Sequence, residues 1–430
     1  MSNRKPIGPE AILEKKKQYL IPCVYHFYRR PPQIVRGAGV YLYDSKGRRY
    51  LDLYSGVSVN ALGHCHPELT EAICEQVRTL QHTTTIYLTE PLVHLAEALA
   101  AVLPGDLRRT FFCASGSEAN EGAALLAALH TGRRGFLALH NGLHGRTKLT
   151  MSLTGLAFWR TDPHPIPDVT LVPAPHGDRC PFERTRGACR CECVDAVAAA
   201  IDRLPEAPAG MFVEPIQGNG GILTPPPEYF PRLRALLRQQ GILFIADEVQ
   251  TGFGRTGRMF ALDHWGVQPD ILTGGKALGG GTPIGFFSTT DAIAASYTRP
   301  GASTFGGNPV TAQAGVTFLR ILRRDGLVER SWRLGARLKG ELERLAARFA
   351  FVREVRGLGL MLGMEIGDHE GRPAAEITDH VLEAMKDAGF LLGKTGSGRN
   401  VLTFMPPLII EEAELMGAVD ALETILQQIQ

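Results

Sequence analysis

The stretch from Phe244 to Gly280 decides the fold. It opens with FIADEVQTGFGRTG (244–257) and closes with PDILTGGKALGG (269–280). Residues 242–246 form a continuous apolar run, which is typical of a strand buried on both faces of a parallel sheet, and residues 271–273 form a second one. Asp247 follows the first run and Lys276 closely follows the second. Because ligands of open α/β sheets bind where the strands end, the stretch predicts functional groups at that edge.

The same alternation continues outward through the middle of the chain. Short apolar segments alternate with amphipathic segments, which is typical of a mostly parallel sheet flanked by helices. The predicted strands are 110–114, 136–139, 170–172, 210–214 and 284–288, and the predicted helices are 118–130 and 227–240. The fold class is therefore α/β.

The two ends of the chain show a different pattern. Residues 31–60 contain short strands, and helices, strands and helices follow after residue 311. The predicted C-terminal elements are helices 311–323, 327–349, 377–388 and 411–429, with strands 359–366 and 401–405. We expect residues 1–60 to form an N-terminal segment that joins a small domain, 61–310 a large domain, and 311–430 the rest of the small α+β domain.

The composition excludes several classes of protein. In 430 residues, 46 Lys and Arg against 44 Asp and Glu give a net charge of +2, which favours neither nucleic acid nor an anionic membrane as partner. Hydrophobic residues make up 44%, which excludes a largely disordered chain. The first 20 residues lack the apolar core of a signal peptide, and no run approaches the roughly 20 apolar residues that span a bilayer. A cytoplasmic protein is the expectation.

The eight cysteines are unevenly placed. Four are scattered and expected to be reduced and partly buried, namely Cys23, Cys65, Cys74 and Cys113. The other four cluster in a segment rich in Arg, Pro and Gly, namely Cys180, Cys189, Cys191 and Cys193. Their spacing is unlike the paired C-x-x-C of zinc sites, so a surface insertion, with or without a disulfide, is favoured over a metal site.

Lys276 and Asp247 are the first candidates for chemistry. Lys276 lies among glycines, in GGKALGGG (274–281), so a ligand can come close to its amine. Such a lysine can condense with a carbonyl group, including the aldehyde of pyridoxal 5'-phosphate (PLP). Asp247 at a strand end would suit the cationic pyridinium nitrogen of that cofactor. A solvated loop lysine and a capping or ion-paired aspartate are the alternatives for each residue taken singly.

Three loops that follow predicted strands add to this pattern. SGSEAN (115–120) places small residues and hydroxyls at the start of a helix, where free N–H groups bind anions. A simple N-cap by Ser115 or Ser117 is the alternative. EPIQG (214–218) and STFGGNP (303–309) are glycine-containing loops of the same kind. No Gly-Lys-Ser/Thr follows, so the first loop is not a P-loop.

Together these motifs resemble the class III (subgroup II) PLP-dependent aminotransferases. SGSEAN, EPIQG, DEVQTGFGRTG, GGK and TFGGNP occur in that family's order, preceded by RGAGVYLYDSKGRRYLDLYSG (36–56) and GHCHPEL (63–69). The resemblance covers about residues 30–420. It implies PLP fold type I: a large domain with a mostly parallel mixed sheet flanked by helices, and a smaller α+β domain from both chain ends. It also implies a homodimer, or a tetramer, with sites at the interface.

The resemblance implies roles for residues at these motifs. Lys276 would bond the cofactor and carry a proton, and Asp247 would hold the pyridine nitrogen protonated. Val249 would pack on the ring, Gln250 would reach its phenolic oxygen, and Glu214 would line the substrate side.

The phosphate has its own residues under the same resemblance. Gly116 and Ser117 would bind it at the start of the helix, and Thr304 would reach it from the partner subunit.

Two positions depart from the family pattern. Leu143 stands before His144-Gly145, where an aromatic residue usually stacks on the cofactor. Either the stacking energy of about 0.5–1.5 kcal/mol is lost, or His144 or another aromatic compensates. Thr403 occupies the place of an arginine that binds the substrate carboxylate. Arg399, with Lys394 as a weaker candidate, would then swing in, unless it is a solvated loop residue.

Within the family the chain is most similar to the alanine–glyoxylate, β-aminoisobutyrate–pyruvate and ω-aminotransferase branch. HTTTIYL (82–88), TFGGNP and the cysteine-bearing insertion carry this likeness. Tyr25, Phe27, Tyr28 and Tyr87 are candidate pocket walls, with ordinary packing as the alternative for each.

The expected function is transamination from an amino acid, a β- or ω-amino acid or a primary amine to pyruvate or glyoxylate, by ping-pong kinetics. The alternatives are a 4-aminobutyrate- or ornithine-type enzyme with 2-oxoglutarate, and a PLP-dependent lyase, decarboxylase or racemase. A non-catalytic binding protein is disfavoured by the intact Lys276 and Asp247. A dehydrogenase is disfavoured because no G-x-G-x-x-G opens a strand–helix unit.

Overall fold

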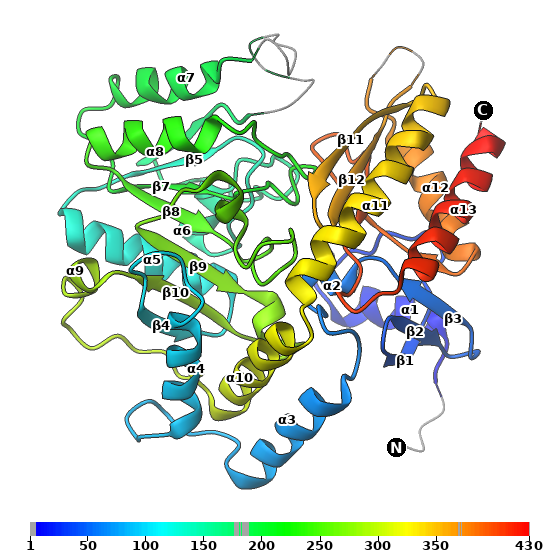
Figure 1. Ribbon diagram of the computed structural model, residues 1–430, viewed down its shortest axis with the longest axis horizontal. Helices are drawn as coiled ribbons and strands as arrows, with labels where there is room; N and C mark the ends of the chain where they lie inside the picture. Colours follow the sequence, from blue (N-terminus) through cyan, green and yellow to red (C-terminus); the bar gives the residue numbers. More distant parts are fainter. Residues whose placement is uncertain are drawn as a thin grey trace.

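The computed structural model describes residues 6–175, 180, 182, 189–368, 370 and 372–429. Its centre is a seven-stranded sheet in the order β4-β10-β9-β8-β7-β5-β6 (Figure 1). Strand β10 runs antiparallel to both neighbours, and the other strands are parallel to one another, as expected. The strands are β4 (Arg109–Cys113), β5 (Phe136–Leu139), β6 (Val169–Val172), β7 (Gly210–Val213), β8 (Leu243–Asp247), β9 (Ile271–Gly275) and β10 (Gly285–Thr289).

Alternating side chains bury the two faces of this central sheet. Phe136 and Ala138 of β5 pack with one group of helices, whereas Leu137 and Leu139 pack with another. Because successive side chains of a strand point to opposite faces, an uninterrupted apolar run is what a sheet covered on both sides requires. One face carries α5 (Gly116–Thr131), α6 (Lys148–Leu153) and α9 (Asp291–Ala294), and the other carries α7 (Glu192–Ile201) and α8 (Tyr229–Gln239).

A second part of the molecule, the terminal block, combines the two chain ends beside the central sheet (Figure 1). An antiparallel sheet has the order β11-β12-β15-β14, and a further sheet joins β1-β2-β3 from the N-terminal side to β13. The strands are β1 (Ile34–Ala38), β2 (Tyr41–Asp44), β3 (Arg49–Asp52), β11 (Val352–Leu358), β12 (Met361–Ile366), β13 (Phe390–Leu391), β14 (Gly393–Thr395) and β15 (Val401–Phe404). The pairing of β13 with β3 brings the N-terminal segment onto the C-terminal part.

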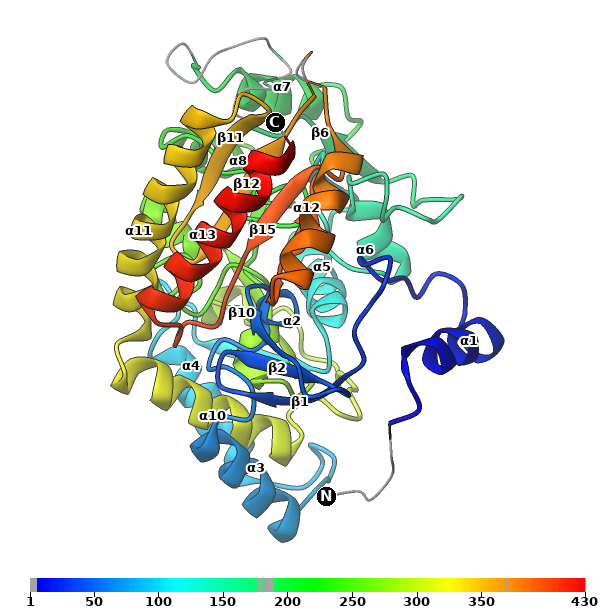
Figure 2. The same cartoon turned by 90° about the vertical axis from the view of Figure 1, so that its right-hand side faces the viewer.

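The remaining helices cover and connect these sheets. Helix α10 packs against α3 and α4 and leads into the long α11 of the terminal block. Helix α1 buries none of its residues and stands apart from the body of the chain (Figure 2). Their bounds are α1 (Pro9–Tyr19), α2 (Ser55–Ser58), α3 (Pro67–Thr79), α4 (Glu90–Ala100), α10 (Pro309–Arg324), α11 (Leu327–Arg348), α12 (Ala375–Asp387) and α13 (Glu412–Ile429).

The cysteine expectations are partly wrong. All eight cysteines are free thiols, so the disulfide alternative is not realised, and Cys23 and Cys65 are exposed rather than partly buried. Cys193 on α7 and Cys191 directly before that helix are buried in the core. Most of the insertion (176–179, 181 and 183–188) lies outside the described residues. No helix in the described ranges has the length and apolar content that a membrane span needs.

Candidate active site at the carboxyl edge of the central sheet

Asp247, the last residue of β8, carries a buried carboxylate held by three donors. Its Oδ2 accepts hydrogen bonds from Asn120 Nδ2 and His144 Nδ1, both at 2.8 Å. Its Oδ1 accepts from the Val249 backbone N–H at 3.1 Å. Burying a carboxylate is tolerable only with such partners. Its oxygens have about four lone-pair sites, so one further cationic donor can be accepted.

Asn120 orients that carboxylate, and the sequence did not reveal this role. Its Oδ1 accepts from Thr273 Oγ1 at 2.7 Å, which leaves Nδ2 as the donor toward Asp247 and toward the carbonyl of His144. The side chain is buried on the face of α5 that otherwise presents alanines such as Ala123. An isolated amide on such an apolar helix face was the available signal, because buried polar groups must find partners.

His144 and Glu214 complete the buried polar cluster. Glu214 follows β7, and its carboxylate accepts backbone hydrogen bonds from Leu143 at 2.7 Å and Gly218 at 3.0 Å. Burial raises the pKa of Glu214 to about 7. Burial alone would lower the pKa of His144, but its hydrogen bond to Asp247 and the nearby carboxylates raise it. His144 therefore donates its Nδ1–H to Asp247, and its buried Nε2 has no partner among the described residues.

Lys276 begins the turn after β9 and faces the same cluster. The two glycines before it are needed, because a Cβ on Gly274 would come within 2.3 Å of the Phe286 ring, and one on Gly275 within 2.8 Å of the Ile284 carbonyl. Burial lowers the pKa of the Lys276 amine, against the opposing charges of Asp247 and Glu214. In the part of the chain that the structure describes, Nζ forms no hydrogen bond or ion pair.

The N-terminus of α5 forms an anion cradle. Ser115 caps the helix by accepting from Glu118 N, while the N–H groups of Gly116 and Ser117 have no acceptor among the described residues. A Cβ on Gly116 would come within 2.8 Å of Val249 Cγ1, so only glycine lets the loop after β8 pack on the helix end. Free N–H groups and the helix dipole favour a bound anion there.

Gln250 connects this cluster to the terminal block. Its Nε2 donates to Met405 Sδ at 3.3 Å, and Met405 follows β15. Tyr54 packs beside Met405 in the same apolar group. The loop that begins at Asp247 therefore reaches the second part of the molecule within three residues.

Arg399 lies over aromatic rings on that side. Its guanidinium carbon is 4.3 Å from the Phe158 ring centre and 5.5 Å from that of Tyr25, and Arg399 has a φ of 51°. Tyr25 also contacts the ring of Trp159, and Phe27 contacts those of Tyr25 and Tyr54. The structure thus groups Arg399 and Tyr25, two residues that the sequence singled out separately.

Other sequence candidates lie elsewhere. Thr304 is exposed in the loop before α10, and Tyr87 is 65% exposed between α3 and α4, so neither joins the buried cluster within one chain. Tyr28 binds the backbone of Leu392 as donor at 3.0 Å and as acceptor at 3.2 Å, which is a packing role. The Lys394 amine pairs with Asp379 inside the terminal block, so it is not a free cation.

Comparisons with known proteins agree with this geometry. Residues 28–426 match the family model described as Aminotransferase class-III. The chain is 42% identical to the acetylornithine aminotransferase of Mycobacterium tuberculosis over 93% of either chain. It is 38% identical to the mitochondrial alanine–glyoxylate aminotransferase 2 homolog 2 of Arabidopsis thaliana, over 97% of this chain and 87% of that one. The solved (S)-enantioselective omega-transaminase of Thermomicrobium roseum superimposes with a TM-score of 0.91 at 32% identity, covering 99% of both chains.

The enzymes of this class use PLP, and the residues present fit that cofactor. An amine without a partner, a buried carboxylate with lone pairs to spare and free N–H groups at a helix start match an aldehyde, a ring nitrogen and a phosphate respectively. The chain therefore belongs to the class III aminotransferases, enzymes that depend on PLP and share the fold type I architecture.

Proposed function

We propose that this enzyme moves an amino group from an amino acid, a β- or ω-amino acid or a primary amine to pyruvate or glyoxylate by a ping-pong mechanism. The observation that carries this is the unpartnered Lys276 amine, which faces Asp247 and Glu214 at the sheet edge. Bound PLP supplies an electron sink that stabilises negative charge at the substrate carbon. A lysine with a lowered pKa can then take and return a proton beside that carbon.

The neighbouring residues hold and orient under the same proposal. Asp247 keeps the ring nitrogen protonated, because Asn120 and His144 fix its carboxylate from one side. Val249 packs on the ring and Gln250 binds its phenolic oxygen. Leu143 provides an aliphatic contact in place of an aromatic ring, while its N–H is anchored by Glu214. Gly116 and Ser117 bind the phosphate.

We further propose a homodimer in which Thr304 and Tyr87 serve the partner's site. In support, both are exposed here, and Ile86 and Leu88 beside Tyr87 are 83% and 99% exposed. Burying such a run of apolar surface against a second copy would remove it from water. A cytoplasmic location belongs to the same proposal, since free thiols persist in a reducing compartment.

Arg399 is proposed to bind the carboxylate of acidic substrates. The Arg399 guanidinium lies over the rings of Phe158 and Tyr25, which attract its charge. If Arg399 moves away, the same aromatic surface can contact an apolar group of the substrate. One pocket could then accept pyruvate as well as an amine without a carboxylate.

Replacing Arg399 with alanine should raise KM for pyruvate roughly 10- to 100-fold, the worth of a hydrogen bond between charged groups, and leave KM for (S)-1-phenylethylamine nearly unchanged. Steady-state kinetics with each substrate varied in turn measures this. Arg372→Ala, which removes an exposed arginine of the terminal block, is the control. An equal change for both substrates would contradict the assignment.

The pH dependence of cofactor capture should report the Lys276 amine. Only the neutral amine attacks the PLP aldehyde, and burial lowers the lysine pKa from its ordinary 10.5. The rate at which apo-enzyme takes up PLP should therefore reach half its maximum below pH 10.5. Because Glu214 opposes this shift, Glu214→Gln should move the midpoint to still lower pH. A midpoint at the ordinary lysine value in both proteins would refute the buried placement.

A second candidate acceptor is 2-oxoglutarate, with donors of the 4-aminobutyrate or ornithine type. The likeness to acetylornithine aminotransferases supports it. A lyase or decarboxylase on the same fold has no comparable observation in its favour.

Titration of the PLP-loaded enzyme with single donors separates these functions. L-alanine, β-alanine, 4-aminobutyrate, ornithine and (S)-1-phenylethylamine are added in turn, followed by pyruvate, glyoxylate or 2-oxoglutarate. Bleaching of the visible band by one donor and its return with a keto acid establishes transamination and names both substrates. A band that no donor bleaches would contradict the proposal.

A further inference from the structure

Arg255 is a buried arginine to which the proposed function assigns no role. Its side chain is 2% exposed, in the loop that leaves the active site after β8. Nη1 donates to the carbonyls of Leu360 at 3.0 Å and Pro406 at 2.5 Å, both in the terminal block. Nε and Nη2 have no partner among the described residues. No described residue forms an ion pair with the guanidinium, and burial lowers its pKa.

Such an arrangement is costly. Buried charges are normally paired, and each buried donor without a partner loses its hydrogen bonds to water with nothing to replace them. An apolar side chain of similar length, such as methionine, would avoid both costs. Methionine, however, has no N–H group, so it cannot bind the carbonyls of Leu360 and Pro406 as arginine does.

The backbone around Arg255 also contacts the terminal block, and we call this contact between the loop after β8 and the terminal block the joint. The carbonyl of Arg255 accepts from Leu360 N at 3.1 Å and from Ser331 Oγ at 2.9 Å. A Cβ on Gly359 would come within 2.4 Å of the Thr256 carbonyl carbon, and one on Gly257 within 2.7 Å of Trp332 Cβ. The loop and the terminal block therefore meet backbone to backbone, with little freedom to shift.

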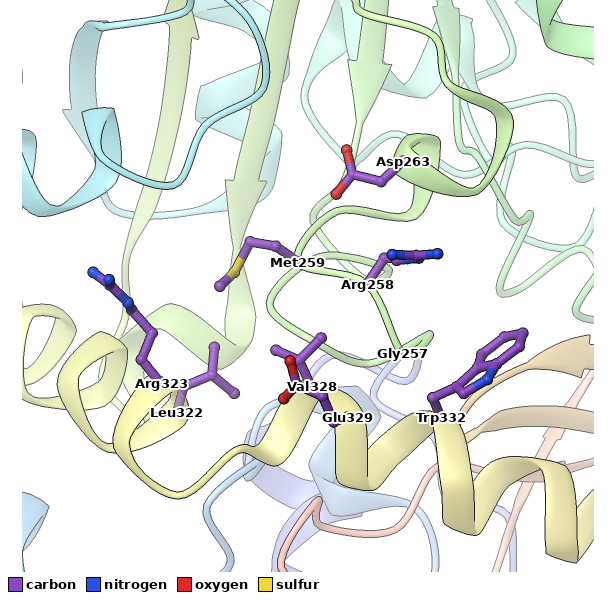
Figure 3. A pocket seen from close by; sticks show the side chains of 9 residues that line it. All are labelled: Gly257, Arg258, Met259, Asp263, Leu322, Arg323, Val328, Glu329 and Trp332. Atoms are coloured by element: carbon purple, nitrogen blue, oxygen red, sulfur yellow. The ribbon is translucent and has the colours of Figure 1, made fainter.

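Figure 3 shows the outer side of this joint. Gly257 and Met259 of the loop line a cavity of about 690 Å³ together with Val328 and Trp332 of α11. Arg258, from the same loop, also lines the cavity and forms no hydrogen bond or ion pair with a described residue (Figure 3). Neither Asp247 nor Lys276 lines the cavity, so it is the outside of the joint and not the active site.

Arg255 joins the loop after β8 to the segment after β15, and both segments contain residues next to the proposed PLP site. Pro406 follows Met405, whose sulfur accepts the hydrogen bond of Gln250. Gln250 and Arg255 lie on the same loop. Holding the Pro406 carbonyl therefore helps to place Met405 beside Gln250. Two further hydrogen bonds hold Met405, because its N–H donates to the Leu53 carbonyl and its sulfur accepts from Ser58 Oγ.

We propose that Arg255 is a positioning residue, which locks the terminal block to the active-site loop so that Met405 holds Gln250 in place for PLP. This rests on the proposed role of Gln250 at the phenolic oxygen. Arg255 itself touches neither cofactor nor substrate.

The experiment measures PLP affinity by titrating apo-enzyme, and records the visible band of the bound cofactor. Arg255→Met should raise the PLP dissociation constant roughly tenfold, as expected when charge-assisted hydrogen bonds are lost, and shift the band. Arg255→Lys, which keeps the charge and one carbonyl bond, should recover part of the affinity. Arg258→Met, the matched loss of an arginine from the same loop, should bind PLP like the wild type.

A double-mutant cycle identifies the route. If Arg255 acts through Gln250, Arg255→Met should have much less effect on PLP affinity in a Gln250→Leu background. Full additivity would overturn the proposal, as would wild-type affinity and an unshifted band in Arg255→Met. Should that variant not fold, Ser331→Ala removes two hydrogen bonds from the joint, because Ser331 Oγ donates to the Arg255 carbonyl and accepts from Leu360 N. It should weaken PLP binding severalfold, and unchanged binding would then overturn the proposal. These readouts need no turnover, so failure to transaminate would count against the proposed function alone.

Discussion

Replacing Lys276 with alanine is expected to lower kcat/KM for amino transfer by at least about 10⁴-fold. Under the proposed function, the variant loses both the amine that bonds PLP and the group that moves the proton beside Asp247 and Glu214. The glycines around it are unchanged, so the fold should persist. Steady-state kinetics and the visible spectrum measure the two losses together.

Lys339→Ala is the matched control for Lys276. Its amine lies on α11 and only donates a long hydrogen bond, at 3.4 Å, to the carbonyl of Gly357. That variant should keep wild-type activity and the visible band. A Lys276→Ala enzyme with more than a few per cent of activity would remove this lysine from the mechanism.

Replacing Asp247 with asparagine should have the second largest effect, a fall in kcat/KM on the order of 10³-fold. The amide keeps the size of the carboxylate but not the charge that, under the proposed function, keeps the ring nitrogen protonated. It also presents an NH₂ group either to the Val249 N–H or to the amide of Asn120, which both donate to Asp247 in the wild type. We therefore also expect a loss of roughly 1–3 kcal/mol in unfolding free energy.

Asp270→Asn separates these two effects. Asp270 lies just before β9, at the opposite edge of the sheet, and pairs with both terminal nitrogens of Arg234 at 2.6 and 2.7 Å. Its replacement should lower the unfolding temperature and leave kcat/KM nearly intact. If Asp247→Asn proved no more harmful to catalysis than Asp270→Asn, the pairing of Asp247 with the ring nitrogen would be wrong.

The local pattern of apolar residues predicted the strands of the central sheet well, but it predicted the strands of the chain ends less well. The strand predicted at 136–139 is β5 as observed. Strand β9 contains the whole run 271–273 that predicted it, and β8 contains residues 243–246 of the run 242–246. Strand β11 (Val352–Leu358) was missed, because Arg353, Glu354 and Arg356 interrupt its apolar residues. Arg356 is buried there by hydrogen bonds to Glu365 of β12 and to the carbonyl of Gly221, partners that no local pattern shows.

The candidate site divides in the same way. Lys276, Asp247, Glu214 and the start of α5 could be predicted, because each follows a strand and parallel strands end at one edge. The role of Asn120 could not, since its partner Asp247 is 127 residues away. The contacts of Arg399 with Phe158 and Tyr25 depend on how three distant loops pack.

The sequence by itself determined the order of strands and helices and the chemical groups at the strand ends. The spacing of apolar residues and the positions of turn-forming residues are local signals, which extend over only a few residues. Only the tertiary structure decided which of those groups meet. Because Asn120, His144 and Arg255 are buried, the hydrogen-bond partners of their side chains are the protein groups that packing brings close to them.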